Sequence, residues 1–288
     1  MTGGSGLVIV DKPAGVTSHD VVSRVRRLAG TRKVGHAGTL DPMATGVLVL
    51  GVNRATRLLG HLTLTAKGYD ATIRLGASTT TDDAEGEVVS TAPTGDLDEA
   101  RIRPALAAMV GDIEQVPTAV SAIKVEGRRA YQRVRAGEDV ELAARPVTIH
   151  ALDVHEVRRV GELVEVDISV RCSSGTYVRA IARDVGAELG VGGHLGSLRR
   201  TSVGPFALDD ARTLEQLADE LTMLPIADAA RASFPSRDLG VAQAGDVRHG
   251  RQIDAELDGL TALFAPDGEF LALYEPSRGT CRAVAVFV

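Results

Sequence analysis

The sequence predicts a chain that mixes strands with helices and ends in a small β unit. Residues 67–75 and 163–170 alternate between apolar and polar side chains, which is typical of strands that bury one face. Helical spacing of apolar residues follows capping signals at 17–20 and 213–216. From about residue 231, short β-prone runs are separated by turn sequences, which indicates a second, smaller domain.

Composition indicates a folded protein with a sizeable core. The chain has 288 residues, of which 44% are hydrophobic. No apolar run approaches the roughly 20 residues of a membrane span, and residues 1–6 lack the charged stretch that opens a secretory signal. The two cysteines, Cys172 and Cys281, favour a reducing compartment over a disulfide framework and cannot form a zinc site alone. We therefore expect a cytoplasmic protein.

Charge is segregated along the chain. The net charge of −6 and the isoelectric point of about 5.7 argue against nucleic acid when the chain is taken as a whole. Residues 24–33 and 124–135 are nevertheless strongly basic, whereas 82–99 carries seven acids and no base. Such segregation can steer a polyanion to one face, although each run by itself is also compatible with an ordinary solvated surface.

The first quarter of the chain reads as strand, helix, loop and strand. Residues 7–10 are β-prone and end at Asp11-Lys12-Pro13. Thr17 and Asp20 match a capping box for a helix that Gly30 would end. A glycine-rich loop, G-H-A-G-T-L-D-P, then presents Asp41 before a buried strand at 47–50. Pro42 restricts Asp41 to extended geometry, and Asp41 reads either as a simple turn residue or as a placed functional carboxylate.

The middle of the chain continues with strands around one helix. Residues 67–75 form a strand, and 79–89 form an acidic turn that enters the next strand. This turn lacks the first and last acidic ligands of a calcium loop, so we reject a metal there. Residues 97–110 predict a helix with Asp98 as its N-cap and a kink or restart at Pro104. Residues 116–137 read as a basic loop around a short helix at 131–134.

Strand character resumes at 145–149 and again at 163–170, where Glu165 and Asp167 are expected to face outward. The run C-S-S-G-T-Y-V-R at 172–179 is a strand that enters a turn. A helix with Ile181 and Val185 on one face follows, and it closes at Gly190. Short strands at 259–264, 269–274 and 283–288 suggest that the C-terminal unit is all-β.

Seven motifs in order resemble the TruB-type tRNA pseudouridine synthases. The central one is G-H-A-G-T-L-D-P-M-A-T-G-V-L-V-L at 35–50. The others are L-V-I-V-D-K-P-A-G at 7–15, K-G-Y-D-A-T-I-R-L-G at 67–76, T-D-D-A-E-G at 81–86, G-D-I-E-Q-V-P at 111–117, C-S-S-G-T-Y-V-R at 172–179 and L-R-R at 198–200. The resemblance covers about residues 7–205 and continues more weakly to the end.

This resemblance implies a mixed α/β (α+β) fold with a large, mostly antiparallel sheet. It places a catalytic domain at 1–232, with a basic tRNA-binding insertion at about 124–150, and a short PUA-like β-barrel at 233–288. The implied reaction converts uridine 55 in the T loop of tRNA to pseudouridine after base flipping. It needs no metal or cofactor, and the implied partner is the T arm of tRNA, with no membrane and no guide RNA. We expect the protein to act as a monomer.

The resemblance also assigns the catalytic residues. Asp41 would attack the substrate covalently, either at C6 of the uracil or at C1′ of the sugar. Arg179 would pair with Asp41 and keep it ionised, and Asp83 would share Arg179. Tyr69 would stack on the uracil and is a candidate for the final proton removal from C5. Without the motif, Asp83 would be read as part of an exposed acidic turn and Arg179 as a surface cation near a helix start.

Four further residues are assigned to substrate binding. His36 would hold the flipped loop, and Tyr177 and Leu198 would line the uracil pocket. Lys12 would support the site. Two alternatives stay open on sequence alone: an RNA-guided enzyme of the dyskerin type, and a tRNA-folding chaperone whose catalysis is dispensable. The insertion and the short chain favour the stand-alone enzyme over the guided one.

Overall fold

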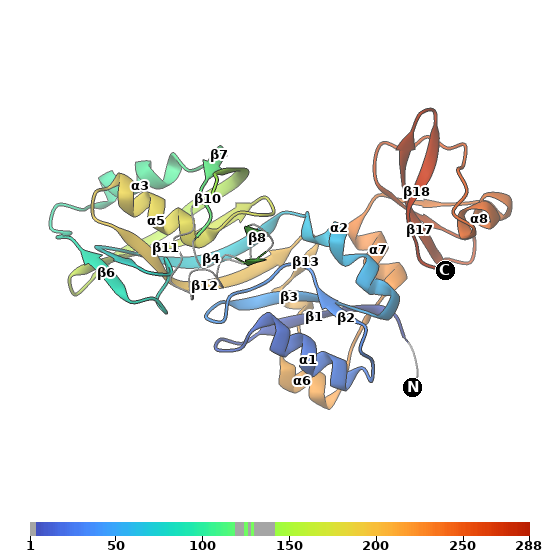
Figure 1. The fold of residues 1–288 in the computed structure, drawn as a ribbon, viewed down its shortest axis with the longest axis horizontal. Coiled ribbons are helices and arrows are strands. Elements are labelled where there is room, and N and C mark those ends of the chain that lie inside the picture. The colour runs from blue at the N-terminus through green and yellow to red at the C-terminus, as the bar shows by residue number, and fades with distance from the viewer. Residues whose placement is uncertain (1–3, 119–123, 126–127, 130–141) are drawn as a thin grey trace. The chain divides into compact units, whose positions relative to one another are not determined.

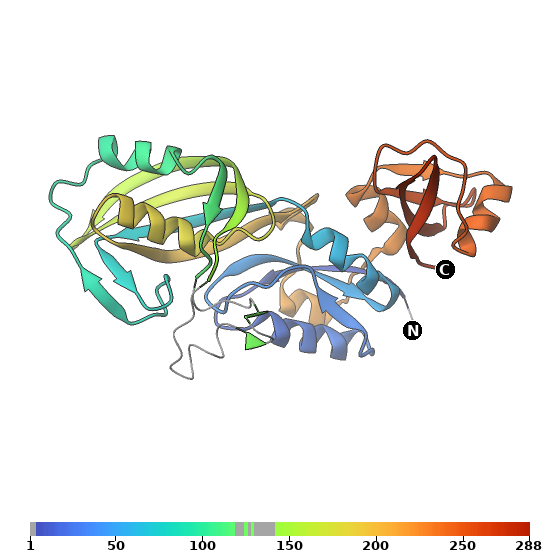
Figure 2. The same ribbon diagram turned by 45° about the horizontal axis from the view of Figure 1, so that its top comes forward.

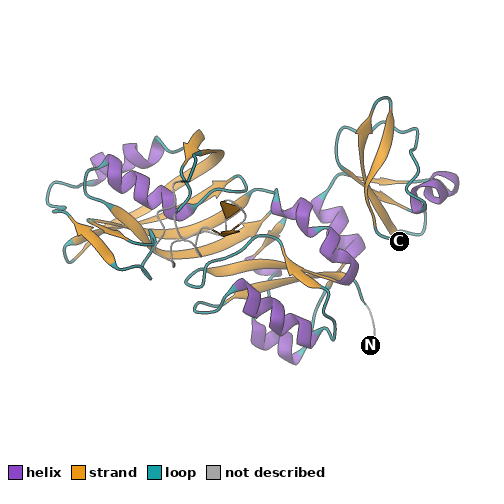
Figure 3. Ribbon diagram, viewed as in Figure 1, coloured by secondary structure: helices purple, strands orange, loops and turns teal. Residues whose placement is uncertain are grey.

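The computed structural model describes residues 4–118, 124–125, 128–129 and 142–288 (Figure 1). The chain forms two compact units. Unit 1 contains Met1–Asp41, Val47–Thr63 and Val203–Val288, and unit 2 contains Pro42–Gly46 and Leu64–Ser202. Both units combine strands and helices, which confirms the predicted mixed α/β class (Figure 3). None of the helices within the described ranges is long and apolar enough to cross a membrane.

Unit 2 is built on a sheet whose strands follow the order β12-β4-β11-β10-β7. The pairs β4–β11, β10–β11 and β7–β10 are antiparallel, as expected for a large antiparallel sheet. Every second side chain of β4 is buried, and helices α3 and α5 lie along that face of the sheet (Figure 1 and Figure 2). The sheet strands and the helices are β4 (Lys67–Leu75), β7 (Gly111–Gln115), β10 (Arg145–Val160), β11 (Leu163–Cys172), β12 (Gly193–Val203), α3 (Glu99–Ala107) and α5 (Val178–Glu188).

The other face of this sheet carries charged side chains that pair with one another. Glu165 accepts hydrogen bonds from Arg74 (2.9 Å) and Arg158 (2.7 Å), and Arg158 also binds Asp167. Burial alone would raise the pKa of Glu165, but the two arginines lower it overall. Glu165 thus faces away from the core as expected, but two guanidinium groups cover it and leave the residue only 8% exposed.

The acidic turn and the helix after it lie where the sequence predicts them. The turn connects β5 (Ala77–Thr79) to β6 (Val88–Thr91), and α3 begins after Asp98, which accepts from the N–H of Arg101 at 3.0 Å. Of the kink or restart expected at Pro104, the restart does not occur, because α3 continues through Pro104 as one helix. The kink stays a prediction. Proline removes one backbone donor, but the buried residues Ile102 and Leu106 hold the helix to the sheet.

About half of the predicted basic insertion at 124–150 falls within the described residues. Residues 124–125 and 128–129 form the two short antiparallel strands β8 (Lys124–Val125) and β9 (Arg128–Arg129), and residues 145–150 belong to the start of β10. The expected short helix at 131–134 lies outside the described residues. The insertion therefore stays a prediction from the sequence.

Unit 1 is organised around β1, which lies between β14 and β3, with β2 antiparallel to β3. Helix α1 has the predicted capping box: the Thr17 hydroxyl accepts from the Asp20 N–H, and the Asp20 carboxylate accepts from the Thr17 N–H. The elements are β1 (Gly6–Lys12), α1 (Ser18–Leu28), β2 (Val34–His36), β3 (Thr45–Val52), η1 (Asn53–Arg57), α2 (Leu59–Thr63), β13 (Phe206–Ala207), η2 (Leu208–Asp210), α6 (Leu214–Asp219), β14 (Leu224–Pro225) and α7 (Ile226–Ser233).

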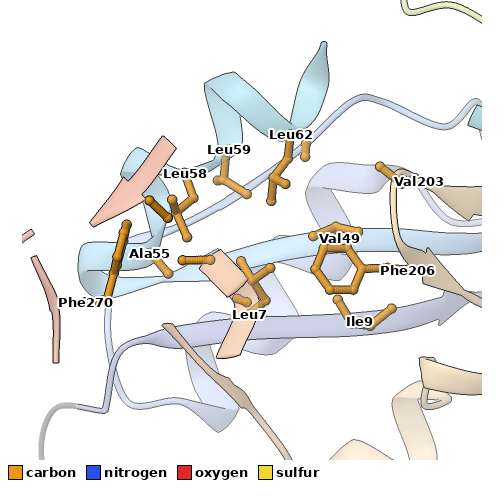
Figure 4. Packing of buried hydrophobic residues seen from close by; sticks show 14 of the residues in the cluster. Leu7, Ile9, Val49, Ala55, Leu58, Leu59, Leu62, Val203, Phe206 and Phe270 are labelled. Atoms are coloured by element: carbon orange, nitrogen blue, oxygen red, sulfur yellow. The ribbon is translucent and has the colours of Figure 1, made fainter. Parts of the chain in front are cut away.

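One apolar core joins the N-terminal strands of unit 1 to its C-terminal part. Leu7 and Val49 project from β1 and β3 toward Leu58 and Leu62, as Figure 4 shows. Phe270 packs into the same cluster. Burying aliphatic and aromatic side chains in this way stabilises the fold by roughly 1.5–3 kcal/mol for each large residue.

The C-terminal part of unit 1 contains a four-stranded sheet in the order β15-β16-β17-β18. The all-β expectation is wrong in one respect, because helix α8 (Val241–Arg248) lies between β15 and β16, and its buried Ala244 and Val247 pack into the local core. Arg54 and Arg57 donate to the backbone carbonyls of Phe287 (2.7 Å) and Val286 (2.6 Å). The strands are β15 (Ser236–Asp238), β16 (Thr261–Phe264), β17 (Phe270–Ser277) and β18 (Thr280–Val286). The domain boundary at 232/233 stays a prediction.

Candidate active site

The loop that carries Asp41 is tied to the start of helix α1. The Ser18 hydroxyl donates to the carbonyl of Leu40 and accepts from the Leu40 N–H, both at 2.9 Å. Gly38 has φ +95°, a conformation that side chains disfavour, so the loop needs glycine there. Asp41 itself is half-buried. Its backbone position is therefore fixed by the buried residue next to it.

The residues directly after Asp41 are fixed in unit 2. Thr45 and Gly46 pair in parallel with Arg199 and Arg200 of β12, and the Thr45 hydroxyl accepts from Arg199 at 3.3 Å. Gly46 has φ +97°, and a Cβ there would lie 2.2 Å from the carbonyl oxygen of Arg200. Only glycine permits this close approach. Asp41 thus lies four residues before a tightly packed segment.

Arg179 and Asp83 form a buried ion pair in unit 2. Their side chains are 5% and 4% exposed, and Arg179 Nη1 lies 3.2 Å from Asp83 Oδ2. Arg179 also donates to the carbonyl of Thr81 at 2.8 Å. Asp83 Oδ1 accepts from the Thr81 hydroxyl at 2.5 Å and from the Glu85 N–H at 3.1 Å. The structure thus brings Asp83 and Arg179 together, and both residues are buried and not surface groups; that Asp83 shares Arg179 with the nucleophile stays a prediction.

Tyr177 is held at the start of the same helix by a residue that the sequence analysis missed. The Gln115 amide donates to the carbonyl of Tyr177 at 3.1 Å and accepts from its N–H at 2.8 Å. Gln115 is only 2% exposed, and its side-chain amide bonds both backbone groups of Tyr177, as a neighbouring strand would. The motif G-D-I-E-Q-V-P contained this glutamine, but nothing in its spacing indicated the contact.

Tyr69 and Leu198 both lie on buried faces of neighbouring strands, on β4 and β12, with 8% exposure each. Lys67 projects from the same face of β4 as Tyr69, since it lies two residues earlier. Burial is the larger cause and the positive charge of nearby Arg200 the smaller one that together lower the pKa of Lys67 to about 8. Burial raises the pKa of the Cys172 thiol, so this cysteine is not an activated nucleophile.

Lys12 and His36 lie in unit 1 with Asp41. Lys12 is fully buried, and its ammonium donates to the carbonyls of Pro13 (2.9 Å) and Val16 (2.7 Å), which fixes the loop before α1. The ring of His36 meets that of His19 edge-on, with 5.8 Å between centroids. The exposed cations of the run 24–33 are in the same unit: Arg24, Arg26, Arg27, Arg32 and Lys33.

The eight predicted site residues thus fall into two groups. Lys12, His36 and Asp41 belong to unit 1. Within unit 2 the structure joins Asp83 to Arg179 directly, and places Tyr177 two residues before Arg179 at the start of α5. Among the described residues, no group of three or more histidines, cysteines or carboxylates could hold a metal ion.

The chain matches three family models that follow one another along the sequence. Residues 26–178 match the TruB family pseudouridylate synthase N-terminal domain, and 179–229 match the tRNA pseudouridylate synthase B C-terminal domain. Residues 234–288 match the C-terminal model of tRNA pseudouridine synthase II. Together these matches account for most of the chain beyond residue 25.

Relatives are similar over nearly their whole length. The chain is 61% identical to tRNA pseudouridine synthase B of Arthrobacter sp. (strain FB24), over 98% of this chain and 96% of that one. It is 60% identical to the protein of the same name from Thermobifida fusca (strain YX), over 98% of each. Among solved structures, a Cbf5-Nop10-Gar1 complex contains a chain 26% identical with a TM-score of 0.76, covering 98% of this chain and 85% of that one.

Proposed function

The chain belongs to the TruB family of pseudouridylate synthases, and on that basis we propose that it converts uridine 55 in the T loop of tRNA to pseudouridine. The protein is a pseudouridine synthase that acts on tRNA, in keeping with relatives that are 57–61% identical over nearly the full chain. The position in the tRNA and the roles of individual residues are the proposal. They extend what family membership implies to this chain.

The proposed reaction is an isomerisation. The C1′–N1 bond of uridine breaks, the uracil rotates, and C1′ is joined to C5. The hydrogen on C5 leaves as a proton while N1 gains one, so that no oxidant or reductant is consumed. The uridine must first leave its stack, which costs a few kcal/mol that contacts in the pocket must offset.

Asp41 is the nucleophile in this proposal. An ordinary aspartate has a pKa near 3.9 and is ionised at neutral pH, so its carboxylate can attack without a separate base. Attack at C6 of the uracil and attack at C1′ of the sugar are both compatible with the chemistry. The fixed backbone at Leu40 before Asp41 and at Thr45 after it supports the role, because a preorganised nucleophile loses little entropy in the attack.

The buried pair Arg179–Asp83 is the observation that best supports a catalytic site. Removing a guanidinium and a carboxylate from water costs several kcal/mol, and their mutual attraction only offsets this cost. A buried ion pair of this kind is therefore more easily explained by a functional role than by stability. We propose that Arg179 orients the Asp41 carboxylate, and that Asp83 orients Arg179. Tyr69 stacks on the uracil and accepts the C5 proton, while Tyr177 and Leu198 line its pocket.

The remaining assignments concern binding of the tRNA. His36 contacts the flipped T loop, and Lys12 supports it by fixing the backbone of residues 13–16. The exposed cations of 24–33, and the basic residues of the sequence run 124–135, contact phosphates, which fixes how the tRNA is positioned but not its sequence preference. We propose that the enzyme works in the cytoplasm as a monomer, without guide RNA, metal or cofactor.

A tritium-release assay tests the proposal. Unmodified tRNA that carries [5-³H]uridine is incubated with the purified protein and a chelator, without guide RNA. We expect release of tritium, pseudouridine at position 55, and no reaction when that uridine is replaced by cytidine. A folded protein that releases no tritium under these conditions would contradict the proposal. A tRNA-folding role independent of catalysis also stays a prediction, which rescue of a deletion strain by Asp41→Asn would reveal.

A further inference from the structure

The acidic turn before β6 meets two arginines of helix α5, and only one of them belongs to the site described above. Arg179 pairs with Asp83, and Arg183, one helical turn later, lies 3.4 Å from Asp82. Consecutive aspartates are thus matched to arginines at positions i and i+4 of one helix. The outer pair is less buried, since the side chains of Arg183 and Asp82 are 28% and 17% exposed.

The guanidinium of Arg183 is fixed by three partners at once. Nε donates to Asp184 at 2.8 Å, Nη1 lies 3.4 Å from Asp82, and Nη2 donates to the carbonyl of Val116 at 2.7 Å. The planar guanidinium group can donate hydrogen bonds to all three partners at once, whereas a lysine ammonium group cannot. Arg183 therefore connects helix α5, the acidic turn and the residue that follows β7.

Asp82 combines an unusual backbone conformation with a half-buried carboxyl group, and contacts with neighbouring residues maintain both. Its φ of +58° lies in the left-handed region, which residues other than glycine seldom occupy. Burial raises the pKa of its carboxyl, while Arg183 and Arg179 act in the opposite direction. Its carbonyl accepts from the N–H of Leu195 at 2.9 Å. Such strain persists only where surrounding contacts impose it, and it is often found beside functional groups.

We propose that Arg183 is a positioning residue for the Arg179–Asp83 pair. It holds the turn in the conformation that presents Asp83 to Arg179, and through Val116 it also fixes the turn relative to the end of β7. This inference rests on the proposed function and deepens it, because it assigns a role to a side chain that lies outside the set of eight. The motif residues alone did not indicate it.

The test compares Arg183→Met with a matched control, Arg103→Met. Arg103 also lies on a helix of unit 2, pairs with a carboxylate four residues away (Glu99, 2.8 Å), and donates to a backbone carbonyl (Val154, 3.1 Å). Single-turnover and steady-state rates on tRNA are measured where both variants are fully folded. We expect Arg183→Met to lower kcat on the order of tenfold or more with KM unchanged, and Arg103→Met to leave both unchanged.

Two further variants distinguish positioning from folding. Arg183→Lys keeps the charge but not the fork, and should fail to restore kcat. Asp82→Gly removes the carboxylate but accommodates φ +58°, so it should fold and also lower kcat. The double variant Arg183→Met with Asp82→Gly should be no slower than the slower single variant, because Asp82 is one of the partners through which Arg183 acts.

The inference is overturned if Arg183→Met is as active as Arg103→Met, or if it raises KM with kcat unchanged, since the latter would make Arg183 an RNA contact. It is also overturned if Arg183→Lys restores full activity. If Arg183→Met does not fold, the test rests on Asp82→Gly alone. A kcat of Asp82→Gly equal to that of the wild type would then contradict the inference. Failure of the proposed function is separate, because the wild-type protein would then form no pseudouridine.

Discussion

Removing the carboxylate of Asp83 should destabilise the protein far more than removing an exposed carboxylate. In Asp83→Ala the guanidinium of Arg179 stays in place with a side chain only 5% exposed, but it loses the ionic partner 3.2 Å away. The Thr81 hydroxyl and the Glu85 N–H lose their acceptor as well. A buried charge without its partner is the main source of the cost.

The expected magnitude follows from the burial of both partners. Breaking a buried ion pair by removing one side costs about 3–5 kcal/mol, whereas an exposed pair at positions i and i+4 is worth about 0.3–0.5 kcal/mol. Glu99 and Arg103 form such an exposed pair in the same unit, with side chains 54% and 45% exposed. Glu99→Ala is thus the matched control for Asp83→Ala.

Urea unfolding followed by circular dichroism measures the difference. We expect Asp83→Ala to lower the free energy of unfolding by about 2.5 kcal/mol or more relative to Glu99→Ala, since about 3 kcal/mol is the lower bound for breaking a buried ion pair and about 0.5 kcal/mol is the upper value for the exposed pair. Asp83→Asn should lie between them, since it keeps an oxygen for Arg179. If Asp83→Ala costs no more than Glu99→Ala, Arg179 is not buried as described, and the reasoning about the site is wrong.

Three further predictions concern stability and binding. The pKa of Lys67 is lowered from 10.5 to about 8, so the unfolded chain binds more protons between these values and stability should rise with pH across them. The rise is worth at most roughly 3 kcal/mol, and Lys67→Met should abolish it in urea curves recorded at each pH. Gly46→Ala should lower the melting temperature much more than Gly30→Ala, because a Cβ would meet the Arg200 backbone at 2.2 Å in the first case and nothing within 4 Å in the second; equal shifts would contradict the close packing. The dissociation constant for tRNA should increase steeply with salt, and Arg27→Gln should reduce the slope of the logarithmic plot by about one; an unchanged slope would exclude Arg27 as a phosphate contact.

Local patterns predicted much of the fold from sequence. The alternation of β4 gave its bounds, Lys67 and Leu75, because a strand with one buried face repeats every two residues. The capping boxes at Thr17 and Thr213 are present because their hydroxyls satisfy specific N–H groups in the first turn. Such signals depend only on neighbours a few residues away, and they can therefore be recognised in the sequence.

Features that depend on distant residues were missed. The restart expected at Pro104 fails because Ile102 and Leu106 are buried against the rest of unit 2, and packing outweighs the lost hydrogen bond. Glu165 faces outward as expected, but its cover by two arginines from other positions was not predicted. Helix α8 was missed since its apolar residues are few and small.

The site shows the same division between local and distant information. The burial of Arg179 and Asp83 contradicts what local chemistry alone suggested, and only the resemblance to a family indicated their pairing. The contacts of Arg183 and Gln115 join segments about 60 to 100 residues apart and leave no local pattern. The match between the two aspartates of T-D-D and the arginines at i and i+4 can be recognised only once the turn and helix α5 are known to meet.

The central claim is that the Asp41 carboxylate attacks the substrate, and the single-turnover rate of Asp41→Asn tests it most directly. The variant keeps the size of the side chain but cannot form the covalent intermediate. With tRNA bound at saturation, we expect the rate of pseudouridine formation to fall at least about 10³-fold while the dissociation constant for tRNA stays within twofold of the wild-type value. A variant that folds, binds tRNA and retains a rate within tenfold of wild type would contradict the claim.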